Sequence, residues 1–227
     1  TTVVADECLS ASSENSSTMI PTNLLYLSRV EIAKCVFELL EAYRILKQRN
    51  PAYTLTIAGD GPDLEALKSR AAEMGLQDVK FDGYVAGPAK VDCYRLGGIF
   101  CFLSYTEGMP NAVLEALAMG MPVVSSEAGG LKDILRDSEN GFIVPFEQDA
   151  PAKKKFNPVD VANAIQRLAE TPNLHERIST VNWRYARQRF AAPVVAKRLE
   201  SIYRNLLSPE PARASRSSES AKPVCVE

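Results

Sequence analysis

Short apolar runs that alternate with helical segments constrain the fold of this chain more than any other feature of its sequence. Strands are predicted over the apolar runs 24–28, 53–58, 79–81, 99–103, 123–124 and 142–144. Helical spacing between those runs predicts helices over 35–48, 63–74, 90–96, 111–119 and 131–135. This order predicts an α/β fold, a Rossmann-like parallel sheet with helices on both faces. The run 99–103 is apolar at every position, which is typical of a strand covered on both sides.

The same pattern divides the chain into four parts. Residues 1–22 include a stretch rich in Ser, Thr, Asn and Glu and are predicted to be a linker or poorly ordered arm. Residues 23–190 form the predicted main domain, and residues 191–207 form a further amphipathic helix. The tail 208–227 is rich in Ser, Pro, Arg and Ala and is predicted to be disordered, because it cannot bury enough apolar surface. Since the first residue is Thr, the sequence also fits a piece of a longer protein.

Composition excludes several classes of protein. Of the 227 residues, 46% are apolar and 24% are charged, which indicates a folded globular protein. A net charge of −2 gives no long-range attraction for nucleic acid or an anionic membrane. No apolar run reaches the roughly 18 residues of a membrane span, and no secretory leader is visible. A cytoplasmic location is expected, with at most peripheral contact at the cytoplasmic membrane face.

The cysteines and the histidine do not indicate a metal site. The five cysteines form no C-x-x-C pair, and the sequence has one histidine. Such a set lacks the spacing of a metal site and fits a reducing compartment. We therefore expect no bound metal.

The stretch from Glu107 to Ser126 is the first candidate for a functional site. A Glu-Gly-Met-Pro turn leads into a helix in which Glu115 is the only charged residue. A carboxylate in an apolar helix is costly unless it is paired or hydrogen-bonded, so Glu115 is predicted to face a polar site. Glu107 precedes the helix N-terminus, where free N–H groups favour anions. Pro110 suits the first helical position, because its missing N–H costs nothing there.

Two cations are predicted to lie near these carboxylates. Ligands of an open parallel sheet bind beyond the carboxyl ends of its strands, where Arg29 and Lys34 follow the first predicted strand. An arginine fork and a lysine point charge on one loop can clamp a diphosphate. Two cations and two carboxylates on neighbouring loops suit a ligand with a phosphate end and a hydroxyl-rich end. This combination predicts a nucleotide-sugar.

Taken in order, the motifs of this chain resemble the donor-binding half of family 4 retaining glycosyltransferases, which have the GT-B fold of two facing Rossmann-like domains. The resemblance covers about 23–144, over half the chain. It rests on Ser28-Arg29, Lys34, Ala58-Gly59-Asp60-Gly61-Pro62, Gly83-Tyr84-Val85, Glu107-Gly108-Met109-Pro110, Leu114-Glu115-Ala116, Gly120-Met121-Pro122-Val123-Val124 and Gly129-Gly130.

The resemblance implies a role for each candidate residue. Arg29, Lys34 and Glu107 would be catalytic: the two cations hold the donor diphosphate, and Glu107 stabilises charge on the transferred sugar. Glu115 would accept hydrogen bonds from the ribose hydroxyls. The remaining substrate-binding residues would be Gly108, Met109, Pro110, Asn111, Gly59, Tyr84, Val85 and Gly130, with the base meeting the backbone near Tyr84 and Val85.

The implied function is metal-independent, configuration-retaining transfer of a sugar to a saccharide or lipid-linked acceptor, as in polysaccharide biosynthesis. The donor would be UDP- or GDP-linked, with no separate cofactor. Family 4 enzymes carry an acceptor domain before this region, which this chain lacks. A separate N-terminal acceptor domain is thus an expected partner, and the helix 191–207 is expected to expose the apolar stripe that would cross back onto it.

Other interpretations remain open. Without the motif context, Arg29 and Lys34 are ordinary surface cations, Glu115 is a solvated helix residue and Glu107 a turn residue. Cys35 stands where the family often has Gly, and its Cβ is expected to crowd a phosphate. That departure, with the missing half, favours a non-catalytic nucleotide-sugar-binding module or a degenerate fragment that needs a partner chain. A Rossmann dehydrogenase is disfavoured, because no strand leads into a G-x-G-x-x-G turn.

Overall fold

The computed structural model describes residues 2–12, 19–147 and 155–207. The predicted disordered tail, 208–227, lies outside the described residues, as does the segment 13–18 of the predicted arm.

A six-stranded sheet forms the centre of the molecule, with strand order β3-β2-β1-β4-β5-β6 and every pairing parallel. The strands are β1 Asn23–Leu27, β2 Thr54–Ala58, β3 Lys80–Gly83, β4 Ile99–Phe102, β5 Val123–Ser126 and β6 Gly141–Val144. The predicted parallel Rossmann-like sheet is therefore confirmed. Chain order reverses between β1 and β4, and the crevice beyond such a reversal is where open α/β sheets bind ligands.

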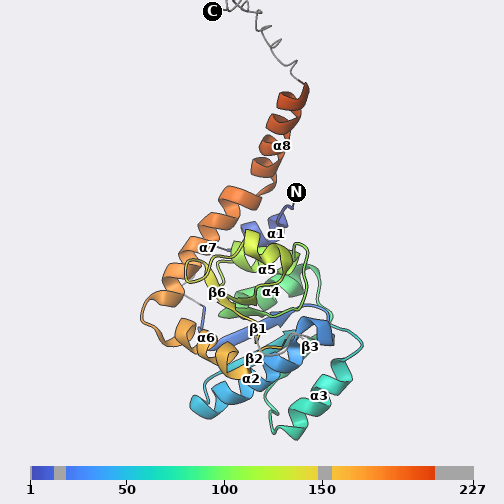
Figure 1. The fold of residues 1–227 in the computed structure, drawn as a ribbon, viewed down its shortest axis with the longest axis vertical. Coiled ribbons are helices and arrows are strands. Elements are labelled where there is room, and N and C mark those ends of the chain that lie inside the picture. Colours follow the sequence, from blue (N-terminus) through green and yellow to red (C-terminus); the bar gives the residue numbers. More distant parts are fainter. Residues whose placement is uncertain (1, 13–18, 148–154, 208–227) are drawn as a thin grey trace, which may run out of the picture.

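Helices cover both faces of the sheet (Figure 1). One hydrophobic cluster joins the sheet to α2 Val36–Arg49, α3 Leu64–Glu73 and α6 Pro158–Glu170. A second cluster joins the other face to α4 Gly87–Leu96, α5 Asn111–Ala118 and the C-terminal part of α7 Leu174–Phe190. Two short 3-10 helices, η1 Ile32–Lys34 and η2 Gly129–Asp133, lie in the loops after β1 and β5. The last of these replaces the short helix predicted over 131–135.

The helix α5 is buried along almost its whole length, and its end is fixed by a glycine. Gly120 has φ +80°, a left-handed conformation that suits glycine and ends many helices. A Cβ at this position would lie 3.1 Å from the Oγ atom of Ser179 in α7. Tight packing between α5 and α7 therefore adds to the conformational requirement.

Part of the arm predicted over residues 1–22 is folded. A short helix, α1 Asp6–Ser10, packs against α5, and the side chains of Val4 and Cys8 are fully buried. Arg187 of α7 donates hydrogen bonds to the carbonyl oxygens of Leu9 and Ser12. These contacts differ from the linker prediction because α5 and α7 supply an apolar surface that composition alone does not reveal.

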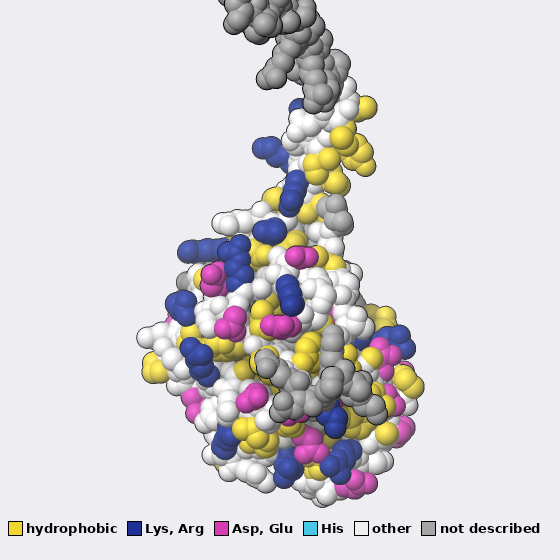
Figure 2. Space-filling model, viewed as in Figure 1, with side chains coloured by type: hydrophobic (Ala, Val, Ile, Leu, Met, Phe, Trp, Pro, Cys, Tyr) yellow, Lys and Arg dark blue, Asp and Glu magenta, His cyan; other side chains and the backbone are white. Residues whose placement is uncertain are grey.

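The C-terminal helix α8, Ala192–Leu207, projects away from the body (Figure 1). Of its described side chains only Val195 is buried, and residues 201–207 are all exposed. Figure 2 shows hydrophobic side chains along one side of this helix and basic side chains along the other. The exposed apolar side chains are Val194, Ile202, Tyr203, Leu206 and Leu207. Exposure of this stripe confirms the expectation for 191–207.

No helix within the described ranges is both long enough and apolar enough to cross a membrane.

Candidate functional site

The site begins with an ion pair at the point where strand order reverses. Lys34 ends η1, in the loop after β1, and Glu107 lies in the loop after β4. Because β1 and β4 are neighbours, their loops meet, and Lys34 Nζ lies 2.6 Å from Glu107 Oε1. The two side chains are only 18% and 9% exposed. Two of the three residues predicted to be catalytic therefore form one largely buried pair.

Backbone contacts fix the two loops against each other. The carbonyl oxygen of Ala33 accepts hydrogen bonds from the Tyr105 amide at 3.1 Å and the Ser104 hydroxyl at 3.2 Å. Since Ala33 adjoins Lys34 and both donors precede Glu107 by a few residues, these bonds hold the ion pair in place.

A third loop, the one after β5, closes on the turn that contains Glu107. A Cβ built on Gly129 would lie 1.8 Å from the Glu107 carbonyl oxygen, and one on Gly130 would lie 2.0 Å from that of Gly108. Only glycine permits such an approach of two backbones. The structure thus brings the predicted residues Gly108 and Gly130 together, and Gly108 itself borders open space.

Gly59 has a close packing role in the neighbouring loops. A Cβ on Gly59 would lie 1.8 Å from the carbonyl oxygen of Ser28, and the Val30 amide donates to the Asp60 carbonyl oxygen at 2.9 Å. The loop after β2 is thereby held against the loop after β1. This close backbone contact is sufficient to explain why residue 59 is a glycine. Contact between Gly59 and a ligand stays a prediction.

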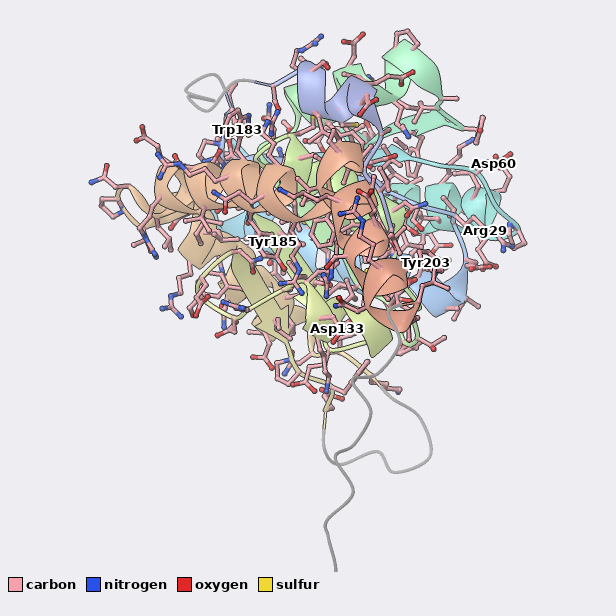
Figure 3. The ribbon with its side chains drawn as sticks, turned by 90° about the horizontal axis from the view of Figure 1, so that it is seen from above. Arg29, Asp60, Asp133, Trp183, Tyr185 and Tyr203 are labelled. Atoms are coloured by element: carbon pink, nitrogen blue, oxygen red, sulfur yellow. The ribbon has the colours of Figure 1, made fainter. Side chains whose placement is uncertain are left out.

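Arg29 is not brought to the ion pair. Its guanidinium lies 3.1 Å from the carboxylate of Glu31, and its side chain is 70% exposed. In Figure 3, Arg29 and Asp60 lie at the same outer edge of the molecule. An exposed arginine has the freedom to turn toward a bound anion, but Arg29 pairs with Glu31 and not with the residues of the ion pair.

Glu115 has the partners that its sequence context demands. Lys90 Nζ lies 2.7 Å from Glu115 Oε1, and Tyr94 Oη donates to Oε2 at 2.9 Å. Burial lowers the pKa of Lys90, but the hydrogen bond and charge of Glu115 outweigh it and the pKa is raised. Burial, reinforced by Glu115, raises the pKa of the Tyr94 hydroxyl, which stays protonated.

Sequence reasoning missed Lys90 and Tyr94. The available signal was their spacing of four residues in the predicted helix 90–96, which places both on one helical face. It could not show that α5 lies against that face.

The other predicted residues lie around the helix α5 and the loop after β3. Tyr84 is 80% exposed and Met109 is 38% exposed, whereas Pro110 is buried. Asn111 is the first residue of α5, and no side-chain hydrogen bond caps this end of the helix. Val85 lines a cavity of about 510 Å³ between α4 and the β1–β3 part of the sheet. That cavity contains no other predicted site residue.

Cys35 does not act as the sequence suggested. It has φ +49°, a left-handed conformation at the start of α2, where glycine is favoured. Its side chain is fully buried in the hydrophobic cluster under α2, and burial raises the pKa of the thiol. The expectation that its Cβ crowds a phosphate is therefore wrong, because the side chain is directed into the core.

Within the described part of the chain, no three His, Cys, Asp or Glu side chains gather in a way that could hold a metal ion.

A parallel sheet with this strand order and helices on both faces defines a Rossmann-like domain, with a charged pair beyond the point where strand order reverses. The family model described as "Glycosyl transferases group 1" matches residues 17–181. The chain belongs to this family.

Known relatives are considerably longer than this chain. A D-inositol 3-phosphate glycosyltransferase of Streptomyces griseus is 30% identical over 200 residues, a match that covers 84% of this chain and 40% of the relative. The matches with three curated relatives cover between 34% and 45% of each relative's length.

Solved structures confirm the predicted half of a GT-B fold. The Anabaena protein HepE, in complex with UDP and glucose, has a TM-score of 0.68 at 21% identity, over 84% of this chain and 49% of HepE. The C-terminal domain of the group 1 glycosyltransferase LpcC from Francisella tularensis has a TM-score of 0.65 at 22% identity. That match covers 84% of this chain and 96% of the LpcC domain.

Proposed function

We propose that this chain is the donor-binding half of a glycosyltransferase and binds a UDP- or GDP-linked sugar in the crevice between β1 and β4. The observation that carries the proposal is the buried Lys34–Glu107 pair at the reversal of strand order. The family to which the chain belongs supports it, as does the presence of UDP and glucose in the HepE structure.

Lys34 and Arg29 hold the diphosphate in this proposal. Both follow β1, and α5 begins nearby at Asn111, where Pro110 has no N–H and no side chain caps the helix. The N–H groups of a first helical turn have no partners within the helix, so they favour an anion. Charges and dipoles fixed in advance stabilise the leaving diphosphate, without a metal ion or a cofactor.

The arrival of the diphosphate changes the partner of Lys34. The ammonium of Lys34 pairs with Glu107. A bound diphosphate competes for this ammonium and frees the carboxylate. Glu107 then faces the transferred sugar, where it stabilises oxocarbenium-like positive charge. Transfer retains configuration, with attack on the face that the diphosphate leaves. Glu115 accepts hydrogen bonds from the ribose hydroxyls.

The acceptor binds elsewhere in the parent protein. We propose a saccharide or lipid-linked acceptor held by an N-terminal domain, with polysaccharide biosynthesis at the cytoplasmic membrane face as the setting. The chain's length relative to its relatives and the exposed stripe of α8 support a missing half.

A non-catalytic nucleotide-sugar-binding module is the alternative, and Arg29 favours it. This arginine pairs with Glu31, so only one of the two predicted cations, Lys34, lies at the crevice. Sugar transfer on addition of an N-terminal half separates the two functions, since a binding module stays inactive with any such partner.

Thermal unfolding with a panel of nucleotides and nucleotide-sugars tests the donor site. A ligand at 100 times its Kd stabilises the folded chain by about 2.7 kcal/mol, a rise in Tm of roughly 5 to 10 °C for a domain of this size. We expect this rise with one base, and its reduction in Glu115→Gln and Lys34→Gln. No rise with any nucleotide would contradict the donor site.

A further inference from the structure

The carboxylate of Glu115 is held from one side by two residues of α4. Lys90 Nζ contacts one carboxylate oxygen at 2.7 Å and Tyr94 Oη contacts the other at 2.9 Å. Lys90 and Tyr94 are four residues apart, so they share a face of α4 one turn apart. Tyr94 is fully buried and its ring packs on Phe100 of β4, with centroids 5.8 Å apart. Packing of Tyr94 against the sheet therefore fixes the position of its hydroxyl group, which hydrogen-bonds to Glu115.

Glu115 also lines a cavity. This cavity, about 340 Å³ in volume, is lined by Val3, Val4, Ala5, Asp6, Asn111, Glu115 and Ala192. No residue of α4 lines it, so Lys90 and Tyr94 contact Glu115 from outside the cavity. An ionised carboxylate has about four acceptor sites, of which α4 occupies two. One hydrogen-bond acceptor position therefore remains on each oxygen, an arrangement that suits the two neighbouring hydroxyl groups of a vicinal diol.

Charge gives Lys90 a second effect. Each carboxylate that the sequence singled out has a lysine partner: Glu107 has Lys34, and Glu115 has Lys90. Without Lys90, the largely buried charge of Glu115 would be uncompensated beside an anionic ligand. Removal of one partner of a buried pair leaves the other charge unpaired, which is strongly unfavourable.

We propose that Lys90 determines ribose specificity: with Tyr94 it fixes both oxygens of Glu115 so that they accept hydrogen bonds from the 2′ and 3′ hydroxyls of a ribonucleotide. Lys90 is a positioning residue, because it acts through Glu115 and does not contact the ligand. This inference rests on the proposed function, in which Glu115 meets the ribose.

Calorimetric titration of the chain with UDP and 2′-deoxy-UDP, and with GDP and 2′-deoxy-GDP, tests the inference. The readout is the ratio of the two Kd values for whichever base binds. We expect the ribonucleotide to bind about tenfold more tightly, since a hydrogen bond to a charged group is lost in the deoxy form. Lys90→Met reduces this ratio to near 1, and Lys90→Arg restores most of it. Lys68→Met, at an exposed lysine paired with Glu65, leaves the ratio unchanged.

Variants of Glu115 separate the inference from the function on which it rests. Glu115→Gln also brings the ratio to near 1, and Lys90→Met in that background has no further effect, because two residues that act as one unit are non-additive. A ratio that survives Glu115→Gln contradicts the ribose role of Glu115. If Glu115→Gln removes the ratio and Lys90→Met keeps it, only the role of Lys90 is overturned. If Lys90→Met fails to fold, the double variant Lys90→Met/Glu115→Gln replaces it, because that variant removes both charges. If the double variant binds UDP or GDP much more weakly than Glu115→Gln alone, Lys90 does not act through Glu115 and the proposal is overturned.

Discussion

The single ammonium group of Lys34 pairs with Glu107 and would bind a diphosphate in the proposed complex. The pair is 2.6 Å apart and largely shielded from water, so the ligand must replace an interaction that is already favourable. Because the Lys34–Glu107 pair must be broken, the net affinity for a nucleotide is lower than it would be without Glu107. If the proposed complex forms, we expect Glu107 to lower affinity for the bare nucleotide and to contribute to binding of the sugar.

Glu107→Gln separates these two effects. We expect UDP or GDP to bind at least about fivefold more tightly, because the largely buried carboxylate of Glu107 no longer competes with the diphosphate for Lys34. The sugar-linked form loses its advantage over the bare nucleotide, since the carboxylate that would face the sugar is gone. Titration calorimetry with both ligands measures the two changes.

Glu127→Gln is the matched control for Glu107→Gln. Glu127 follows β5 at the same edge of the sheet, but its ion pair with Lys132 is exposed. Neither affinity should change in this variant. Weaker binding of the bare nucleotide to Glu107→Gln would show that Lys34 is not released by the loss of its partner.

Cys35 tests the conformation at the start of α2. A left-handed backbone costs an L-residue about 1 to 2 kcal/mol, and a β-branched side chain more. We expect Cys35→Gly to change the free energy of unfolding by less than about 1 kcal/mol, since relief of strain offsets the lost thiol and added chain entropy. Cys35→Val should cost about 2 kcal/mol or more in urea unfolding. Cys101→Val, at an equally buried strand position, should cost less; equal losses would mean that the backbone at Cys35 is unstrained.

Among the secondary-structure elements, α7 carries the one histidine of the sequence, so its titration can be followed without interference from another. His175 Nε2 lies 2.8 Å from the carbonyl oxygen of Gly98, just before β4, and burial lowers its pKa. Between the folded pKa and the ordinary value of about 6.5, the unfolded chain binds a proton that the folded chain does not. Stability due to His175 is therefore present above pH ~6.5 and is lost as pH falls below it.

We expect the free energy of unfolding of the natural chain to decline from pH 7 to pH 5 more steeply than that of His175→Gln, whose amide can still donate to Gly98. Urea unfolding at intervals of half a pH unit measures the two slopes. Parallel slopes would show that the imidazole stays accessible to protons in the folded chain.

The elements that could be predicted best from the sequence are those whose apolar residues repeat regularly. The strands and α2 through α5 were located to within a few residues, because both sheet faces are covered and each element carries its own burial pattern. The arm was missed, since α1 has only five residues and its folding depends on the surface of α5 and α7. Helices shorter than a few turns gain their stability from tertiary contacts.

The same distinction holds for the site. Lys34 and Glu107 could be placed together from topology alone, because each follows a strand and β1 and β4 are adjacent. The contact of Glu115 with Lys90 could not, because it depends on how α4 and α5 pack side by side. The direction of Arg29 was equally hidden, since an exposed side chain has several rotamers of similar energy.

At the scale of the whole molecule, we expect the end of α8 to be needed for sugar transfer but not for the stability of this domain. Residues 201–207 are exposed, so deletion of everything after Glu200 should move the Tm by less than about 2 °C and leave nucleotide affinity unchanged. Sugar transfer with an added N-terminal half should fall strongly, because the stripe containing Ile202 and Leu206 is lost. Differential scanning calorimetry and a transfer assay measure the two effects. A large fall in Tm would mean that α8 belongs to the core of this domain.

The arm and the end of α7 meet at one point, where the Val4 amide donates to the Phe190 carbonyl oxygen at 3.0 Å. Residues before Val4 and the helix after Phe190 therefore leave the domain side by side. A body tethered at two adjacent points turns easily about the line between them but resists sliding. Any neighbouring domain joined through these two segments would be anchored at adjacent points, so we expect the crevice to open and close mainly by rotation about the line between them.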